Sequence, residues 1–344
     1  MLLVVVVIAA AADAWTTTRG RSSSSSSSSR LQAKRVFIDG EAGTTGLQVR
    51  ERLARHDEVE VVSLLGSDRK DPKKRAEVIN SVDAVVLCLP DEAAREAVGL
   101  VAPGNPVKIV DASTARRCDD DWVYGFPEMC RGQRDRIRES SRIANPGCYA
   151  TGFIALARPL VDAGLLRRDA RLACSAVSGY SGGGKALVEI HESPGAEPWG
   201  AYGLGLSHKH LPEMAKHSRL ETPPLFLPSV GHYYAGMVVS IMLHVDGGDR
   251  LYAALDAHYR DEPFVTVVDP DNVEPFLERG TFLEPTRLNG SNNLELFVFK
   301  NDHHKTAVLS ARLDNLGKGA SAAAVQNLNI ALGLEEHLGL DLDI

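Results

Sequence analysis

The sequence predicts two folded domains: a doubly wound parallel α/β sheet, then an α+β domain whose sheet is mostly antiparallel. Between residues 34 and 147, short apolar strands alternate with helical segments, the order that builds a parallel sheet with helices on both faces. Between residues 170 and 315 the strands are short and alternate apolar with polar residues, as at 237–244 and 294–300, which favours an antiparallel sheet. The 344 residues are 44% hydrophobic and 24% charged, enough for two such domains.

Charge and cysteine content exclude several classes of protein. The net charge is −7 and no basic stripe runs through the body of the chain, which argues against nucleic acid as a partner. Five cysteines make an odd count without a CxxC pair, and no His or Cys cluster has zinc-ligand spacing. We therefore expect free thiols, no disulfide framework and no metal.

The first thirty residues have the composition of a targeting segment. Residues 2–12 are apolar but too short to span a bilayer, and small residues follow at 10–14. Residues 15–30 contain eight consecutive serines, three arginines and no acid. This order resembles the bipartite plastid presequence of algae with secondary plastids. It predicts cleavage of residues 1–33, import into a plastid and no membrane segment in the mature chain. A secretory signal with a linker, or mitochondrial import, is the alternative.

A glycine loop follows the first predicted strand. Residues 36–39 form a short β-branched and aromatic run, and the loop GEAGTTG comes directly after it, ahead of a helical segment. Strand, glycine loop and helix in this order build the first turn of a Rossmann-type domain, where the helix N-terminus binds a pyrophosphate. The GxxGxxG spacing departs from the commoner GxGxxG, and alone it is compatible with a turn that holds no ligand. The candidate pyrophosphate-binding residues are Gly40, Gly43, Thr44, Thr45 and Gly46.

The end of the second predicted strand indicates which dinucleotide binds. Residues 59–65 lead into GSDRK, where such a fold meets the adenine ribose. Ser67, Arg69 and Lys70 offer a hydroxyl and positive charge to a 2′-phosphate, whereas Asp68 is the residue that would favour NADH. We predict NADP(H) as the cofactor.

Two further buried strands extend this sheet. Residues 84–90 and 107–111 are apolar runs typical of parallel strands. Between them, Asp91 is expected to cap an alanine-rich helix. Cys88 then belongs to the core packing and has no chemical role.

The candidate nucleophile is Cys148, in the phrase NPGCYATG. Phe153, Leu156 and Leu160 follow at helical spacing, which puts Cys148 at or just before a helix N-terminus. There the helix dipole and free backbone N–H groups stabilise a thiolate, so we expect a lowered thiol pKa and donors for an oxyanion. A buried structural cysteine is the alternative, and it is the preferred interpretation of the other four.

Two histidines are candidates for the proton carrier. His208 and His210 flank Lys209 just before a segment in which Pro212 suits the first helical position. Because the proline should keep Leu211 extended, the two histidines are expected to face the same way, and either could reach a thiol. The sequence does not choose between them.

A second glycine-rich turn, SGYSGGGK at 178–185, is expected near the reacting end of the cofactor. Ser181, Gly182 and Gly183 offer backbone contacts to the cofactor or to a phosphate. A flexible surface loop is the alternative.

Several of these phrases together resemble the N-acetyl-gamma-glutamyl-phosphate reductases, in particular their shorter type 2 branch. The resemblance runs from residue 35 to about residue 333. The phrases that carry it are FIDGEAGTTG (37–46), DAST (111–114), NPGCY (145–149), VSGYSGGGK (177–185), HKH (208–210), PEM (212–214) and GKGAS (317–321).

The resemblance implies that N-acetyl-glutamyl phosphate is reduced to N-acetyl-glutamate semialdehyde in arginine biosynthesis, with release of phosphate and NADP. Cys148 would form a thioester and expel phosphate, hydride would reduce the thioester, and a histidine would protonate the oxyanion. His210 is the first choice for this acid–base role and His208 the second.

It also implies roles for four other side chains. Arg117 is a candidate clamp for phosphate or carboxylate, and Asn145 and Tyr149 would shape the substrate pocket. A C-terminal helix would bring Asn327 toward the nicotinamide. Arg116 stands where related sequences usually have histidine, and Ala150 where proline is common, which bears on substrate affinity more than on reaction type.

The expected organisation follows. Residues 34–147 would bind NADP, completed by a helix at 318–334, and residues 148–317 would carry catalysis and oligomerisation, as a homodimer or homotetramer. Three alternatives are an aspartate-semialdehyde dehydrogenase, a cysteine hydrolase or acyltransferase working without hydride, and a non-catalytic cofactor-binding subunit.

Overall fold

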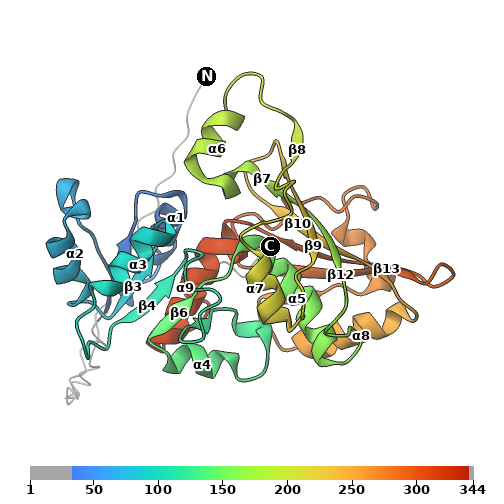
Figure 1. Ribbon diagram of the computed structural model, residues 1–344, viewed down its shortest axis with the longest axis horizontal. Coiled ribbons are helices and arrows are strands. Elements are labelled where there is room, and N and C mark those ends of the chain that lie inside the picture. The colour runs from blue at the N-terminus through green and yellow to red at the C-terminus, as the bar shows by residue number, and fades with distance from the viewer. Residues whose placement is uncertain (1–32, 341–344) are drawn as a thin grey trace, which may run out of the picture. The chain divides into compact units, whose positions relative to one another are not determined.

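Residues 33–340 are described by the computed structural model, and they form two β-sheets with helices packed on them (Figure 1). The predicted fold class, a parallel α/β domain followed by an α+β domain, is confirmed. The predicted presequence lies, apart from Ala33, outside the described residues. Within residues 33–340, no helix is both long and apolar enough to cross a membrane.

The first sheet is six-stranded and parallel throughout, in the order β2-β1-β3-β4-β6-β5. β2 lies on one side of β1, and β3 and the later strands lie on the other. The topological switch point is therefore between β1 and β3, where a doubly wound sheet binds its ligand. Its strands are β1 (Lys34–Asp39), β2 (Val59–Val62), β3 (Ala84–Leu87), β4 (Lys108–Asp111), β5 (Val123–Tyr124) and β6 (Arg142–Ala144).

Successive side chains of a strand point to opposite faces of the sheet, and here both sets are apolar, so helices cover both faces. Ile38 packs into a core with α1 (Thr44–Leu53), α4 (Gln133–Glu139) and α9 (Ala322–Leu332). Phe37, one residue earlier, packs into the core formed with two other helices, α2 (Pro72–Ile79) and α3 (Asp91–Gly99). Figure 1 shows α9, in red, returning from the end of the chain to lie beside β4.

The second sheet is seven-stranded, in the order β11-β12-β13-β10-β7-β9-β8. Only the pairs β7–β9 and β11–β12 are parallel among its described strands. Its strands are β7 (Ala173–Gly179), β8 (Trp199–Ala201), β9 (Leu225–Gly231), β10 (Met237–His244), β11 (Val265–Val267), β12 (Leu294–Asn301) and β13 (Thr306–Leu313).

One face of this sheet is covered by α5 (Cys148–Asp162), which packs on β10 and β13 with α7 (Leu211–Ser218) and α8 (Gly248–Tyr259) beside it. A Cβ at Gly152 would stand 2.9 Å from Val239, so the missing side chain lets α5 approach β10 closely. The helix α6 (Gly184–His191) follows β7. The limits that we predict for the two domains stay predictions.

The capping role predicted for Asp91 is wrong. Pro90 is the N-cap of α3 and Asp91 is its first residue. The Asp91 carboxylate instead accepts hydrogen bonds from the backbone N–H of Thr114, at 2.9 Å, and from its hydroxyl. Asp91 therefore connects α3 to the loop that follows β4.

Candidate active site

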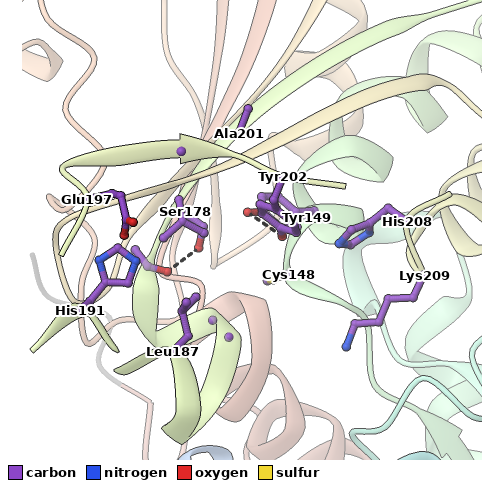
Figure 2. A pocket seen from close by; sticks show the side chains of 15 residues that line it. Cys148, Tyr149, Ser178, Leu187, His191, Glu197, Ala201, Tyr202, His208 and Lys209 are labelled. Carbon is purple, nitrogen blue, oxygen red and sulfur yellow. Dashed lines mark hydrogen bonds between the residues drawn. The ribbon is translucent and has the colours of Figure 1, made fainter. Parts of the chain in front are cut away.

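A cavity of about 490 Å³ lies beside the N-terminus of α5, and we call it the catalytic cavity. In Figure 2, His191 and Glu197 lie at one end, His208 and Lys209 at the other, and Cys148 between them. The residues that line it are Cys148, Tyr149, Ser178, Gly179, Gly182, Gly183, Leu187, His191, Glu197, Gly200, Ala201, Tyr202, His208, Lys209 and Val230.

Cys148 is the first residue of α5, as predicted, and it is half-buried on the wall of this cavity. Burial raises the pKa of the Cys148 thiol above its ordinary value, although the charge of Arg117 and the backbone N–H of Tyr149 act in the opposite direction. The prediction of a lowered pKa is therefore wrong for the resting protein, because desolvation outweighs the helix N-terminus. Cys148 rests as a thiol and needs a base.

His208 lies on the cavity wall as a neutral ring. Burial, followed by the charge of Lys209, lowers the pKa of His208 to about 4. Its Nδ1 accepts the backbone N–H of His210 at 3.1 Å. Because a backbone amide only donates, Nδ1 carries no proton and the ring proton sits on Nε2. His208 can donate a hydrogen bond through Nε2, but it cannot take up a proton without losing the bond at Nδ1.

His210 is buried behind the wall, against the start of α5. A Cβ at Gly147, the N-cap of α5, would stand 2.6 Å from His210 Nε2, and that nitrogen is 3.9 Å from Glu213 Oε1. Burial and then the charge of Arg117 lower the pKa of His210 well below its ordinary value. A neutral imidazole packed against Gly147, the residue before Cys148, is a candidate acceptor for the thiol proton.

The extended conformation predicted ahead of α7 is wrong. Leu211 begins α7, and its N–H donates to the carbonyl of His208 at 3.0 Å, so the segment turns. The rings of His208 and His210 meet edge to face with centroids 4.7 Å apart. The turn explains why one histidine faces the cavity while the other is buried beneath it.

Arg117 lies behind the wall, paired with a buried carboxylate. Its Nη1 donates to Glu213 Oε1 at 3.0 Å, and its Nε and Nη2 donate to the carbonyls of Asn145 and Ala112. Arg117 does not line the cavity, and all three of its nitrogens donate to protein acceptors. Arg117 therefore fixes Glu213 and the turn that precedes Cys148, and its predicted role as an anion clamp stays a prediction.

Glu213 joins this arrangement from α7. Its Oε2 accepts the Tyr124 hydroxyl at 2.8 Å and the backbone N–H of Gly147 at 3.2 Å. The carboxylate thus holds the N-cap of α5 and lies near His210, and it is 1% exposed.

Of the pocket-shaping residues, only Tyr149 reaches the cavity. Its hydroxyl donates to the carbonyl of Ser229 at 3.1 Å. Asn145 donates to the carbonyl of Ala320 and accepts a bond from Asn327, whose amide also donates to Gly125. The Asn327 amide nitrogen is used in the core, but its Oδ1 is buried without a hydrogen-bond partner among the described residues, so the predicted contact with the nicotinamide stays a prediction.

The second glycine-rich turn follows β7 and is partly on the wall. Gly182 and Gly183 line the cavity, as predicted. Ser181 does not: its N–H donates to the carbonyl of Tyr234 at 3.0 Å, and its hydroxyl accepts a bond from Asn315. The backbone contact predicted for Ser181 is therefore not available to a ligand.

The glycine loop forms a second cavity, of about 400 Å³, which we call the cofactor pocket. A Cβ at Gly40 (φ +90°) would stand 2.2 Å from the carbonyl of Cys88, and one at Gly46 would stand 2.5 Å from the carbonyl of Gly40. Only glycine allows so close a turn. The residues that line this pocket are Phe37, Ile38, Asp39, Gly40, Glu41, Ala42, Gly43, Leu64, Gly66, Arg69, Lys70, Cys88, Leu89 and Pro90.

These features fit a dinucleotide. Gly43 caps α1 without a side-chain hydrogen bond, which leaves the first-turn N–H groups, those of Thr44, Thr45 and Gly46, for a pyrophosphate. Arg69 and Lys70 lie on the pocket wall, whereas Ser67 does not. Cys88 packs against the sheet core, as predicted, but it also lines this pocket.

Three wall residues, and Glu213 behind the wall, were missed from the sequence. Lys209 and Glu213 stand in the HKH and PEM phrases, so proximity to the histidines was a usable signal. His191 and Glu197 have no such signal, because the fold alone brings α6 and the loop before β8 to the cavity. Within residues 33–340, no group of three or more His, Cys, Asp or Glu side chains could hold a metal ion.

The thiol and imidazole groups predict a specific pH dependence. The rate of Cys148 alkylation by iodoacetamide should rise steadily with pH, without a plateau between about pH 5 and 8, because a thiol with raised pKa faces neutral histidines. Mass spectrometry of the Cys148 peptide would measure this rate apart from that of the exposed Cys118. A plateau reaching down to about pH 6 would show a preformed thiolate–imidazolium pair and contradict the prediction.

The two family models that match the chain make it a member of the semialdehyde dehydrogenases, in agreement with a parallel α/β sheet followed by a cysteine at a helix N-terminus in a mostly antiparallel domain. Residues 35–138 match the family model described as the semialdehyde dehydrogenase NAD binding domain, and residues 148–315 match the semialdehyde dehydrogenase dimerisation domain. Aspartate semialdehyde dehydrogenase II from Vibrio cholerae, solved in complex with ASA, is similar in fold. Its TM-score is 0.64 at 15% identity, covering 88% of this chain and 99% of that one.

Sequence relatives define the family more narrowly. The N-acetyl-gamma-glutamyl-phosphate reductase 2 of Nostoc sp. is 52% identical over 320 residues, covering 89% of this chain and 99% of the relative. The N-acetyl-gamma-glutamyl-phosphate reductase of Burkholderia lata is 48% identical over 308 residues, covering 87% and 96%. The chain belongs to the N-acetyl-gamma-glutamyl-phosphate reductase family, as the resemblance of its motifs predicted.

Proposed function

We propose that the protein reduces N-acetyl-glutamyl phosphate to N-acetyl-glutamate semialdehyde and phosphate, with NADPH, as a step of arginine biosynthesis. The observation that carries the proposal is Cys148, placed on the cavity wall at the N-terminus of α5 with His208 and His210 beside it. The family supports the choice of substrate, since the relatives named above are N-acetyl-gamma-glutamyl-phosphate reductases.

The groups of the cavity can perform the reaction as follows. The Cys148 thiol passes its proton to a neutral histidine, and the sulfur bonds to the acyl carbon as the bond to the phosphate oxygen breaks. When bound by the glycine loop, Arg69 and Lys70, NADPH would supply the hydride that reduces the thioester. The histidine returns its proton to the resulting oxyanion, and the thiohemiacetal then releases the aldehyde and regenerates the thiol.

The two histidines divide these tasks in our proposal. His210 accepts the thiol proton, because its ring lies against Gly147 and its Nδ1 has no hydrogen-bond partner within the described residues. His208 donates a hydrogen bond through Nε2 to the substrate oxygen and keeps this proton, because its Nδ1 is held by a backbone N–H. The proton returned to the oxyanion is therefore the one that His210 accepted. Glu213, 3.9 Å from His210, would stabilise the imidazolium form.

Lys209 is our second candidate for the phosphate-binding cation, beside Arg117. Among the described residues that line the catalytic cavity, it is the only lysine or arginine. Replacing Lys209 with Met is expected to raise the KM for phosphate in the reverse reaction by about 10-fold or more, since a hydrogen bond to a charged group contributes roughly 1.5–3 kcal/mol. Initial rates at varied phosphate would measure it.

A matched control separates this effect from a general loss of positive charge. Lys73→Met removes an exposed lysine from α2, on the other domain, and should leave the KM for phosphate unchanged. An unchanged KM in Lys209→Met as well would exclude Lys209 as the phosphate-binding group.

NADP(H) is the proposed cofactor, because Arg69 and Lys70 offer positive charge on the wall of the cofactor pocket. The match to a NAD binding domain supports a nicotinamide cofactor in general. Rates with NADPH and NADH at equal concentration would test the choice, and a preference for NADH would overturn it.

Absorbance at 340 nm tests the reaction itself. Protein starting near residue 31 would be given N-acetyl-glutamate semialdehyde, phosphate and NADP, and a phosphate-dependent rise in NADPH is expected. A rise with aspartate semialdehyde alone would move the substrate to the aspartate-semialdehyde dehydrogenases. No rise with either aldehyde would favour a reaction without hydride.

We further propose a homodimer formed through the open face of the second sheet. Val239 and Ala311 face α5, so side chains of opposite alternation point away from the helices. Four large apolar residues on that side are 36–60% exposed, namely Leu225, Leu227, Met242 and Val308. The match to a dimerisation domain supports an oligomer. Light scattering that gives a monomer mass at micromolar concentration would refute it, and a tetramer would require a second interface.

Plastid import is proposed from the serine- and arginine-rich composition of residues 1–33. A fluorescent protein fused behind these residues should accumulate in the plastid of an alga with secondary plastids. Fluorescence in mitochondria or in the medium would support the alternatives instead.

A further inference from the structure

A wide helical turn lies directly behind Cys148. Residues Gly317–Ser321 form a π-helical turn between β13 and α9. Its hydrogen bonds span five residues, from the N–H of Gly319 to the carbonyl of Asp314 at 2.9 Å, and from Ser321 to Leu316 at 2.8 Å. Such turns are rare and are found frequently at functional sites.

Gly319 touches the nucleophilic residue through its bare backbone. A Cβ built on Gly319 would stand 2.7 Å from the Cβ of Cys148 and 3.2 Å from its Cα. Contacts under 3.0 Å essentially never occur between real Cβ atoms. The backbone of Gly319 therefore forms the surface on which the Cys148 side chain rests, and no other amino acid leaves this space.

Hydrogen bonds hold the turn from several sides and oppose its displacement away from Cys148. The Asp314 carboxylate accepts the N–H groups of Gly290 and Leu316, at 2.8 and 2.9 Å. The carbonyl of Ala320 accepts the side-chain amide of Asn145 at 3.0 Å. Since Asn145 lies three residues before Cys148, the turn holds both the nucleophile and the loop leading to it.

We propose that Gly319, presented by this turn, is a positioning residue that fixes the direction in which the Cys148 thiol enters the catalytic cavity. The inference rests on the proposed role of Cys148 as nucleophile. It adds that the rate depends on a backbone contact from the far end of the chain. Covalent catalysis requires the sulfur to approach the acyl carbon closely, and a displacement of about 1 Å costs about 10²-fold in rate.

The test is Gly319→Ala. Its kcat is expected to fall by about 10²-fold, while the KM for phosphate and the Kd for NADPH change by less than about 2-fold, because the cavity wall and the cofactor pocket are otherwise intact. Iodoacetamide should alkylate Cys148 more slowly at every pH, with the same pH dependence, since the change is in position and not in charge. Gly99→Ala is the matched control, because Gly99 is exposed on α3 and a Cβ there meets no atom within 4 Å.

A purely structural role would give a different result. The KM, the Kd and the alkylation rate would then be normal for the folded fraction of Gly319→Ala, and kcat per titrated Cys148 would match the unaltered chain. That outcome would overturn the proposal. The alkylation readout needs no substrate, so it distinguishes failure of this inference from failure of the proposed reaction.

A second pair of variants covers the case in which Gly319→Ala folds poorly. If the added methyl group collides with the Cys148 side chain, removing that side chain should relieve the collision. The drop in Tm caused by Gly319→Ala should therefore be smaller in a Cys148→Gly background than in the unaltered chain. Equal drops in both backgrounds would show that Gly319 does not press on Cys148 and would contradict the proposal.

Discussion

Replacing Cys148 with serine is expected to lower kcat by at least about 10⁴-fold while leaving the affinity for NADPH unchanged. Burial already raises the pKa of the thiol, and a hydroxyl in the same place would be far harder to deprotonate. The neutral histidines beside it are too weak as bases to compensate, since the pKa of His208 is lowered to about 4 and that of His210 well below its ordinary value.

NADPH binding should survive because the cofactor pocket is built from the glycine loop and the end of β3, on the other domain. Absorbance at 340 nm gives the rate, and quenching of protein fluorescence by NADPH gives the affinity. Cys118→Ser is the matched control, since Cys118 is exposed and lies outside the cavity. Loss of both activity and NADPH binding in Cys148→Ser would show that the cysteine is structural, and retained activity would exclude it as nucleophile.

The parts of the site that could be predicted from the sequence are those that depend on neighbouring residues. A glycine loop between a strand and a helix gives a turn whose close contacts only glycine allows, and Gly40 and Gly46 make such contacts. The NPGC turn before a helical segment likewise predicted Cys148 at the start of α5, where the structure has it, with Gly147 as the N-cap. In both places the local chain geometry determines the result.

The side-chain partners that could not be predicted are residues distant in the sequence. Arg117 was predicted to bind an anion because a guanidinium can hold a phosphate or carboxylate through two hydrogen bonds, and nothing in the local sequence indicates that the fold pairs it with Glu213, 96 positions away. Ser181 was expected to offer a backbone contact to a ligand, and its N–H instead donates to the carbonyl of Tyr234, 53 positions away (234 − 181). The local sequence does not distinguish a polar side chain that faces a ligand from one that faces the core.

The prediction of a lowered pKa for the Cys148 thiol was wrong for a related reason. A helix N-terminus lowers the pKa of a cysteine by a predictable amount, but desolvation depends on what covers the site. For Cys148, part of that cover comes from the turn at Gly319, 171 residues later in the chain (319 − 148). Burial is a property of the whole fold, so the sign of this shift could not be obtained from local sequence.

Replacing Lys318 with Met is expected to destabilise the protein by about 3–5 kcal/mol, the usual cost of removing one partner from a buried ion pair. Lys318 Nζ donates to Glu128 Oε1 and to Gln326 Oε1, both at 2.7 Å, and the side chains of Lys318 and Glu128 are 1% and 0% exposed. The pair joins the turn behind Cys148 to the first domain. Arg134, the next cation, is 4.0 Å from Glu128 and already pairs with other carboxylates.

The loss of stability in Lys318→Met should be smaller at low pH than at high pH. Burial acts to raise the pKa of Glu128, but the charge and hydrogen bond of Lys318 outweigh it and hold the pKa below its ordinary value. In the unaltered chain this pair therefore contributes stability above about pH 4.3, the ordinary pKa of Glu, and the contribution is lost as the pH falls through the folded value. Without Lys318 the buried carboxyl group should take up a proton, so the variant should be impaired less at pH 5 than at pH 8.

Urea unfolding at these two pH values would measure the effect. Lys74→Met is a control for loss of a surface ion pair, because Lys74 and Glu77 are both largely exposed, and it should leave the midpoint nearly unchanged. Adding Glu128→Gln to Lys318→Met should recover part of the lost stability, since no buried charge is then left unpaired. If the double variant were less stable than Lys318→Met at pH 8, the cost would lie in packing around Phe126 and Phe264, whose rings lie 5.7 and 5.5 Å from Lys318 Nζ, and not in the unpaired carboxylate.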